Sequence, residues 1–186
     1  AIYKLLQTQF YASPYMEKFV IEALFMMGKS EYGLKRLKER FQPMVDDKNH
    51  TTLFEGWGIG KEGYGGGSTN HAWSGGGLTI LAQYVCGLYP LEPAWKRFMV
   101  KPDLGGLEFA ETGNETLAGR VDVKVTKTKA GMDIELTVPN GSEAVVYIPA
   151  KEKLVLINDK KRRSSGREGI YKLYTITGGE YRISAR

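Results

Sequence analysis

The stretch VDVKVTKTKAGMDIELTV, residues 121–138, decides the fold class of the C-terminal half of this 186-residue chain. Apolar side chains occupy every second position over residues 121–125 and again over 134–138, on either side of a turn at Lys129-Ala130-Gly131. A period of two residues is typical of a β-strand with one buried face. We therefore predict two half-buried strands.

The residues that follow repeat this pattern. Asn140-Gly141 is a hairpin signal, and polar or glycine-containing turns separate further short apolar runs. Strands are predicted at 97–101, 145–148, 154–157, 171–176 and 181–183. Prolines at 90, 93 and 102 mark a connection before them, which places a domain boundary near residue 95. Residues 95–186 are thus predicted to form an antiparallel β-sandwich.

Residues 1–94 have a helical period instead. Ser13-Pro14 supplies an N-cap followed by proline at the first helical position, and Gly28 would end this first helix. Ser30 would cap a second helix that ends before Pro43, and a third is predicted over residues 73–86. Short loops between helices favour antiparallel neighbours, so the first two should form a helical hairpin.

Composition excludes several functional classes. The net charge of +5 leans on the run Lys160 to Arg163, which is predicted to be a solvated hairpin tip, so we expect no nucleic-acid partner. No apolar run approaches the roughly 18 residues of a membrane span. His50, His71 and Cys86 are too few for a zinc site of ordinary spacing, and no metal or cofactor is expected. A single cysteine cannot form an internal disulfide, so the cysteine content does not indicate the cellular compartment of the protein.

Ten of the 23 glycines fall between Gly56 and Gly77, interleaved with aromatic and polar residues. Glycine lets the backbone approach a ligand closely, and loops of this length are usually functional. The side chains between the glycines are of the types that stack on sugars and hydrogen-bond to them. A flexible linker would have no reason to carry two tryptophans. Any chemistry is therefore expected between residues 49 and 77.

Three segments in this order resemble the C-terminal end of the bacterial α-L-rhamnosidase family of inverting glycoside hydrolases. They are TTLFEGW at 51–57, GSTNHAWSG at 67–75, and WKRF with KP at 95–98 and 101–102. The resemblance implies an α+β multidomain fragment in which residues 1–94 are the C-terminal helices of an (α/α)6 toroid and residues 95–186 the antiparallel β-sandwich. It also implies that the remaining toroid helices and the general acid lie upstream of Ala1, so this segment alone would be an inactive glycosidase. The start AIYKLLQTQF, without initiator Met or signal peptide, also suggests a piece of a longer protein.

By the same resemblance, Glu55 matches the general base of the inverting reaction. Phe54 and Trp57 are expected to shield it from bulk water, which would make it a better base. His71 offers the donor and acceptor that a vicinal diol can use, and Trp57 or Trp73 could stack on a deoxyhexose. Asn70 is expected to cap the third helix. Asp46 and Glu62 are further carboxylates near the loop, without a supporting motif.

Two functions from different classes follow. In the first, the segment supplies the general base and part of the sugar pocket of an enzyme that removes terminal α-L-rhamnose. Its partners would be a rhamnose-containing glycan and the N-terminal part of the same protein, with self-association of the isolated piece and a periplasmic or extracellular location slightly favoured. In the second, the chain is a non-catalytic carbohydrate-binding or scaffold unit, with sugar on an exposed aromatic row such as Tyr171, Tyr174 and Tyr181.

Overall fold

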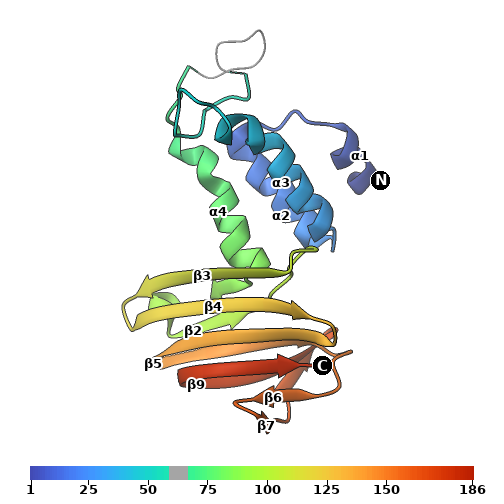
Figure 1. The fold of residues 1–186 in the computed structure, drawn as a ribbon, viewed down its shortest axis with the longest axis vertical. Helices are drawn as coiled ribbons and strands as arrows, with labels where there is room; N and C mark the ends of the chain where they lie inside the picture. Colours follow the sequence, from blue (N-terminus) through green and yellow to red (C-terminus); the bar gives the residue numbers. More distant parts are fainter. Residues whose placement is uncertain (59–66) are drawn as a thin grey trace. The chain divides into compact units, whose positions relative to one another are not determined.

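A computed structural model describes residues 1–58 and 67–186 of the chain. The chain divides into two compact units, Ala1–Ile80 and Leu81–Arg186 (Figure 1). The first unit is helical and the second is built on one large sheet. The domain division expected near residue 95 stays a prediction, and the compact units divide earlier because residues 88–90 already pair with the sheet.

The helical unit is built on a hairpin of α2 (Pro14–Met26) and α3 (Ser30–Val45), preceded by the short α1 (Ile2–Thr8). The Ser13 hydroxyl accepts a hydrogen bond from the Met16 amide, so the predicted cap and the proline at the first helical position are both present. Gly28 ends the helix region with a φ of 66°, which is the left-handed conformation that favours glycine. The first predicted helix is therefore confirmed.

The other two predicted helices need correction. Lys29, not Ser30, is the N-cap of α3, and the helix continues through Pro43 to Val45. Pro43 lies in the last turn, where its missing N–H removes a single ladder bond and the helix survives. The third helix is divided into the 3-10 turn η1 (Ala72–Gly75), α4 (Gly76–Ile80) and a π turn, η2 (Leu81–Val85).

A buried ion-pair network joins α2, α3 and the C-terminal end of α1. Glu17 and Arg36 are 0% and 2% exposed, and the Arg36 guanidinium donates to both carboxylate oxygens of Glu17. Arg36 also donates to the carbonyl oxygens of Leu6 and Gln9. Arg40 pairs with the same carboxylate at 3.1 Å, and burial lowers the pKa of Arg40. Two cations thus surround one buried acid and tie the three segments together.

The second unit begins with η2 and holds nine strands joined in one sheet. They are β1 (Leu88–Pro90), β2 (Arg97–Val100), β3 (Phe109–Thr116), β4 (Gly119–Thr128), β5 (Gly131–Pro149), β6 (Val155–Ile157), β7 (Lys160–Lys161), β8 (Gly166–Glu168) and β9 (Tyr171–Ala185), with the short η3 (Pro93–Trp95) before β2. The pairings between the described strands are antiparallel except for β2 with β5.

The strands β5 and β9 are long and take part in both halves of this sheet. The first half of β5 pairs with β4, and its second half pairs with β2. Both halves pair with β9, with a register shift between Val138 and Glu143. Side chains from the two halves share one hydrophobic core, which includes Val123, Leu136, Val146 and Ile176. The unit is thus a sandwich-like, mostly antiparallel sheet rather than a stack of separate sheets.

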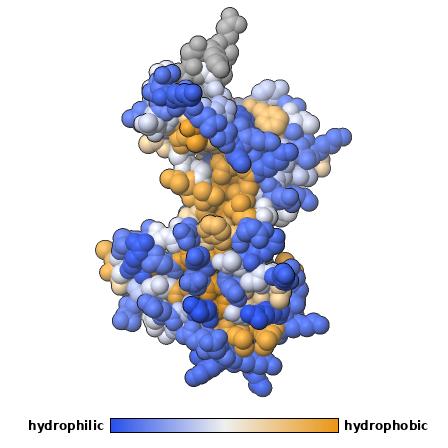
Figure 2. Space-filling view, viewed as in Figure 1, coloured by the Kyte–Doolittle hydropathy of each residue, from blue (hydrophilic) through white to orange (hydrophobic). Residues whose placement is uncertain are grey.

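The hairpin predicted at Asn140-Gly141 is wrong, because these residues form a bulge inside β5. Gly141 has a φ of 85° and supplies the local turn without ending the strand. The strands predicted at 171–176 and 181–183 are likewise one strand, β9 (Tyr171–Ala185). Figure 2 shows hydrophilic side chains over most of the visible face of this unit, with smaller apolar patches between them. No helix among residues 1–58 and 67–186 is long and apolar enough to cross a membrane.

Candidate active site

Two short segments of the helical unit bring Glu55 and His71 together. The Glu55 amide donates to the Ser68 carbonyl at 3.0 Å, and the His71 amide donates to the Leu53 carbonyl at 2.9 Å. These bonds close the glycine-rich span at its base, so that residues far apart in sequence lie side by side. Glu55 Oε2 and His71 Nδ1 are 3.9 Å apart. The structure thus places Glu55 and His71 close together, and their roles in a site stay predictions.

Both side chains can be reached from solvent. The side chain of Glu55 is 43% exposed and that of His71 is 27% exposed. Their separation is longer than a hydrogen bond between the two groups, which would be about 2.7–3.2 Å. The carboxylate and the imidazole consequently keep hydrogen-bonding capacity for a third group. A water molecule or a sugar hydroxyl is the size of group that such a pair can hold.

A buried serine anchors this segment and was not singled out from the sequence. Ser74 is 0% exposed, and its hydroxyl donates to the carbonyl oxygen of Phe54 at 2.7 Å. The Thr52 hydroxyl likewise donates to the Thr69 carbonyl. Both bonds fix the backbone beside Glu55. A serine in a glycine-rich stretch carries no sequence signal for such a bond, because its partner is a distant carbonyl.

Trp57 is partly buried and packs against the core of the helical unit. Its indole N–H donates to the Ala12 carbonyl at 2.7 Å, and the Arg40 guanidinium stacks 4.1 Å from its ring. The ring also packs edge-on against Phe41, in a cluster that includes Phe54. These contacts are those of a structural anchor, two residues after Glu55. The shielding of Glu55 expected from Phe54 and Trp57 is not present in this chain, because the Glu55 side chain is 43% exposed. The sugar-stacking role of Trp57 stays a prediction.

Trp73, unlike Trp57, is largely exposed to solvent. It is 67% exposed, and its ring lies 5.5 Å from His71 and 5.1 Å from Tyr15. An exposed aromatic face next to the Glu55–His71 pair fits the predicted stacking role. Asn70 does not cap the following helix, because His71 occupies the N-cap position of η1 without a side-chain bond.

Asp46 and Asp47, two further carboxylates near the loop, are engaged elsewhere. Asp46 accepts a hydrogen bond from Gln42 at 2.8 Å. Asp47 accepts bonds from Asn49 and His50, and these bonds lower the pKa of Asp47. Glu62 lies outside the described residues. Within the described parts of the chain, no group of three His, Cys, Asp or Glu side chains could hold a metal ion.

Comparisons with known proteins agree on one family. The model of the bacterial alpha-L-rhamnosidase C-terminal domain matches residues 87–163. An alpha-L-rhamnosidase from Alteromonas sp. (strain LOR) is 28% identical over 96% of this chain and 19% of its own length. The resemblance to the C-terminal part of α-L-rhamnosidases is confirmed.

Two solved α-L-rhamnosidases show the same fold. The enzyme from Dictyoglumus thermophilum has a TM-score of 0.77 at 23% identity, over 91% of this chain and 20% of that one. The enzyme from Streptomyces avermitilis, solved with L-rhamnose, has a TM-score of 0.75 at 20% identity, over 91% of this chain and 17% of that one. The chain thus spans about a fifth of the length of the rhamnosidases that it matches.

The aromatic row considered for the sheet unit does not form. Tyr174 is 5% exposed and belongs to the hydrophobic core, whereas Tyr171 and Tyr181 are partly buried. Tyr171 and Tyr174 are an odd number of residues apart in β9, so they point to opposite faces. A sugar cannot stack along all three rings at once.

Proposed function

We propose that this chain belongs to an inverting α-L-rhamnosidase, in which it supplies the general base, Glu55, and part of the sugar pocket. The observation that carries the proposal is the Glu55–His71 pair, 3.9 Å apart and open to solvent. The C-terminal domain match and the rhamnosidase relatives support the reaction class. The helical unit would be the last part of the (α/α)6 toroid.

In this proposal Glu55 removes a proton from the water that attacks the anomeric carbon. An inverting glycosidase holds that water between its base and the sugar, with the acid on the opposite side of the bond, about 6.5–9.5 Å from the base. His71 would hold a sugar hydroxyl through its second hydrogen-bonding nitrogen. Trp73 would contact the apolar face of the sugar. The three side chains would thus orient the sugar and the water relative to one another.

In this proposal the general acid comes from another part of the protein. Glu17 is fully buried between two arginines, so its carboxylate has no route to a substrate. The pKa of Asp47 is lowered, which disfavours the protonated form that an acid catalyst needs. The relatives are about five times longer than this chain, which leaves room for that acid upstream.

The test is a Glu55→Gln variant of the longer protein that contains this segment. Glutamine keeps the size and the hydrogen bonds of the side chain but cannot accept the proton. We expect kcat on an aryl α-L-rhamnoside to fall by about three powers of ten or more, with KM little changed. Glu39→Gln is the matched control, because that side chain is 64% exposed and forms an exposed ion pair with Lys35. Full turnover in the Glu55 variant would show that Glu55 is not the general base.

A second expectation concerns the 186 residues alone. Large apolar side chains of the helical unit are exposed, among them Tyr11 at 92%, Met26 at 78% and Leu78 at 75%. Missing toroid helices would cover such a surface, and without them the isolated chain should self-associate. It should also hydrolyse no aryl rhamnoside, because the acid is absent. Measurable hydrolysis by this chain would contradict the proposal that the general base and the general acid lie in different parts of the protein.

A further inference from the structure

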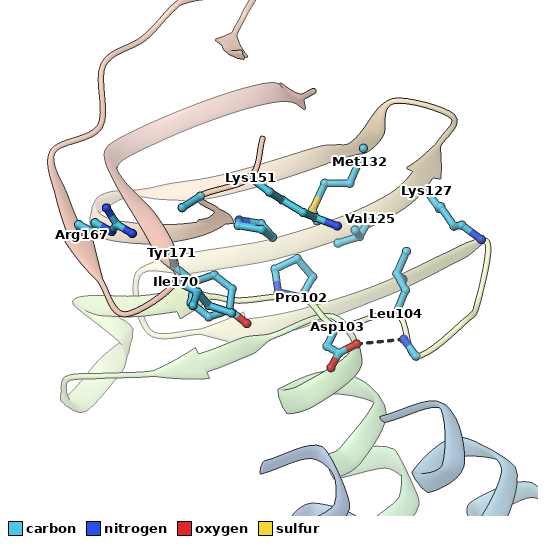
Figure 3. Close-up of a pocket in the computed structure, with 14 residues that line it drawn as sticks. Pro102, Asp103, Leu104, Val125, Lys127, Met132, Lys151, Arg167, Ile170 and Tyr171 are labelled. Atoms are coloured by element: carbon cyan, nitrogen blue, oxygen red, sulfur yellow. Dashed lines mark hydrogen bonds between the residues drawn. The ribbon is translucent and has the colours of Figure 1, made fainter. Parts of the chain in front are cut away.

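The sheet unit contains a cavity that the proposed reaction does not use. It has a volume of about 720 Å³, which lies within the range of roughly 300–1,000 Å³ that is usual for ligand pockets. Its walls come from the loop after β2, the facing ends of β4 and β5, the turn after β5, and the β8–β9 turn (Figure 3). All of these segments belong to the sheet unit. The cavity is thus a feature of this unit alone.

The lining combines apolar surface with positive charge. Pro102, Leu104, Val125, Met132 and Ile170 supply apolar groups. Figure 3 shows three basic side chains distributed around them on different segments, Lys127, Lys151 and Arg167. Asp103 is the single acidic residue of the lining. The cavity therefore favours a ligand that has an apolar face and more than one negative charge.

The basic side chains differ in how far they are already paired. Lys127 is bound to Glu108 at 3.2 Å. The side chain of Lys151 is 81% exposed, and its ammonium lies 3.9 Å from a Glu152 carboxylate, which is a weak surface contact. Arg167 uses its Nε–H for the Gly169 carbonyl. Its two terminal nitrogens have no hydrogen-bond partner within the described parts of the chain and can donate to a ligand. Lys151 and Arg167 are thus the two groups able to bind an anion.

Tyr171 gives the cavity a fixed polar wall. The Lys101 ammonium lies 4.6 Å from the centre of its ring, and Tyr147 packs against it edge-on. Burial and the nearby Asp103 charge raise the pKa of Tyr171, so its hydroxyl stays protonated as a donor. A ring held in this way can offer one hydroxyl in a constant position. Such a group suits the hydroxyls of a sugar.

We propose that this cavity binds an acidic oligosaccharide, one that carries a carboxylate on successive sugar units. The C–H faces of the sugars would lie on the apolar residues, and the carboxylates would pair with Arg167 and Lys151. The choice of a sugar over another polyanion rests on the proposed glycosidase function. The sheet unit would then hold an acidic stretch of the glycan on which the enzyme acts, separately from the Glu55 site.

The test is the binding of trigalacturonate to the 186-residue chain by isothermal titration calorimetry. A trimer of galacturonate has one carboxylate on each sugar, and its methyl ester is a neutral match of nearly the same shape. The double variant Lys151→Ala/Arg167→Ala should weaken binding by about tenfold or more, because charge-assisted hydrogen bonds are lost. The ester should bind at least about tenfold more weakly than the acid.

The control variant is Lys160→Ala/Arg163→Ala, which removes two exposed charges from the basic hairpin outside the cavity. It should leave the affinity for trigalacturonate unchanged. Equal loss in this variant would show non-specific attraction and overturn the proposal. Tight binding of a triglutamate peptide, equal binding of the ester, or no binding of the trimer would overturn it as well.

A Glu55→Gln substitution separates this proposal from the proposed function. It should abolish hydrolysis in the longer protein while leaving the affinity of this chain for trigalacturonate unchanged. If that variant hydrolyses rhamnosides normally but the trimer still binds through Arg167, the base assignment fails and the glycan site stands. If hydrolysis depends on Glu55 and the trimer does not bind, the base assignment stands and the proposed glycan site fails.

Discussion

Replacing Arg36 by leucine should destabilise the helical unit by about 3–5 kcal/mol, the usual effect of removing one partner from a buried ion pair. The Arg36 guanidinium donates to both oxygens of Glu17 and to two backbone carbonyls. Leucine would fill part of the space but would leave those acceptors with fewer donors. Arg40 would be the remaining cation beside a carboxylate that is 0% exposed.

The matched control is Lys35→Leu, one position earlier on α3. Lys35 and Glu39 form an exposed pair at 3.7 Å, with both side chains 64% exposed. Such pairs contribute about 0.3–0.5 kcal/mol. The two substitutions change the same kind of charge on the same helix, so their difference isolates burial. A double variant, Glu17→Leu/Arg36→Leu, should recover part of the loss because it leaves no unpaired buried carboxylate.

The assay should report on the helical unit separately from the sheet unit. Hydrogen exchange followed by mass spectrometry, on peptides from α2 and α3, gives the free energy of opening for that unit. We expect protection in these peptides to fall by about a hundredfold or more in the Arg36 variant, and by less than threefold in the Lys35 variant. Similar protection in both variants would refute the reasoning that burial makes this ion pair indispensable.

Three further predictions can be checked on the same chain. Gly87→Ala should lower the melting temperature of the sheet unit far more than Gly28→Ala lowers that of the helical unit. Both glycines have positive φ, but an added methyl at Gly87 would lie 2.1 Å from a backbone carbon, whereas Gly28 has open space. The sheet unit should lose stability as the pH rises from about 9 through 11, because burial raises the pKa of the Cys86 thiol to about 11 and the unfolded thiol ionises first. A Cys86→Ala variant should lack this part of the slope in urea titrations. Trp57→Phe should destabilise the helical unit by about 1–2 kcal/mol through its lost hydrogen bond, whereas Trp73→Phe, at an exposed position, should leave stability unchanged by the same urea assay.

Much of the secondary structure follows from local patterns. The alternation over residues 121–125 and 134–138 predicts strands, because it places the apolar side chains on one face, which can pack against a core. All of these alternating apolar side chains are buried. Ser13-Pro14 marks the start of α2 because the cap and the fixed proline φ act within one turn. The errors occur where a local signal is ambiguous. Asn140-Gly141 is compatible with a turn or with a bulge, and only the pairing of β5 with β9 decides between them.

The candidate site was also predicted from the sequence only in part. Glu55 and His71 could be selected from the motifs around them, and the distance between them could not. That distance depends on the backbone bonds from Glu55 to Ser68 and from His71 to Leu53, which join segments on either side of a long loop. The difference between Trp57 and Trp73 was also invisible in the sequence. It depends on whether a partner such as the Ala12 carbonyl is available to bury the ring.

The amino-acid sequence by itself determined most of the helical and extended segments, and which motifs carry the rhamnosidase resemblance, since those properties depend on neighbours a few positions apart. Tertiary structure alone decided that Arg36 and Glu17 meet, that one tryptophan anchors the loop while the other is exposed, and that three basic residues surround one cavity. Those contacts join residues distant in the chain, and their energies depend on burial, which no local pattern specifies.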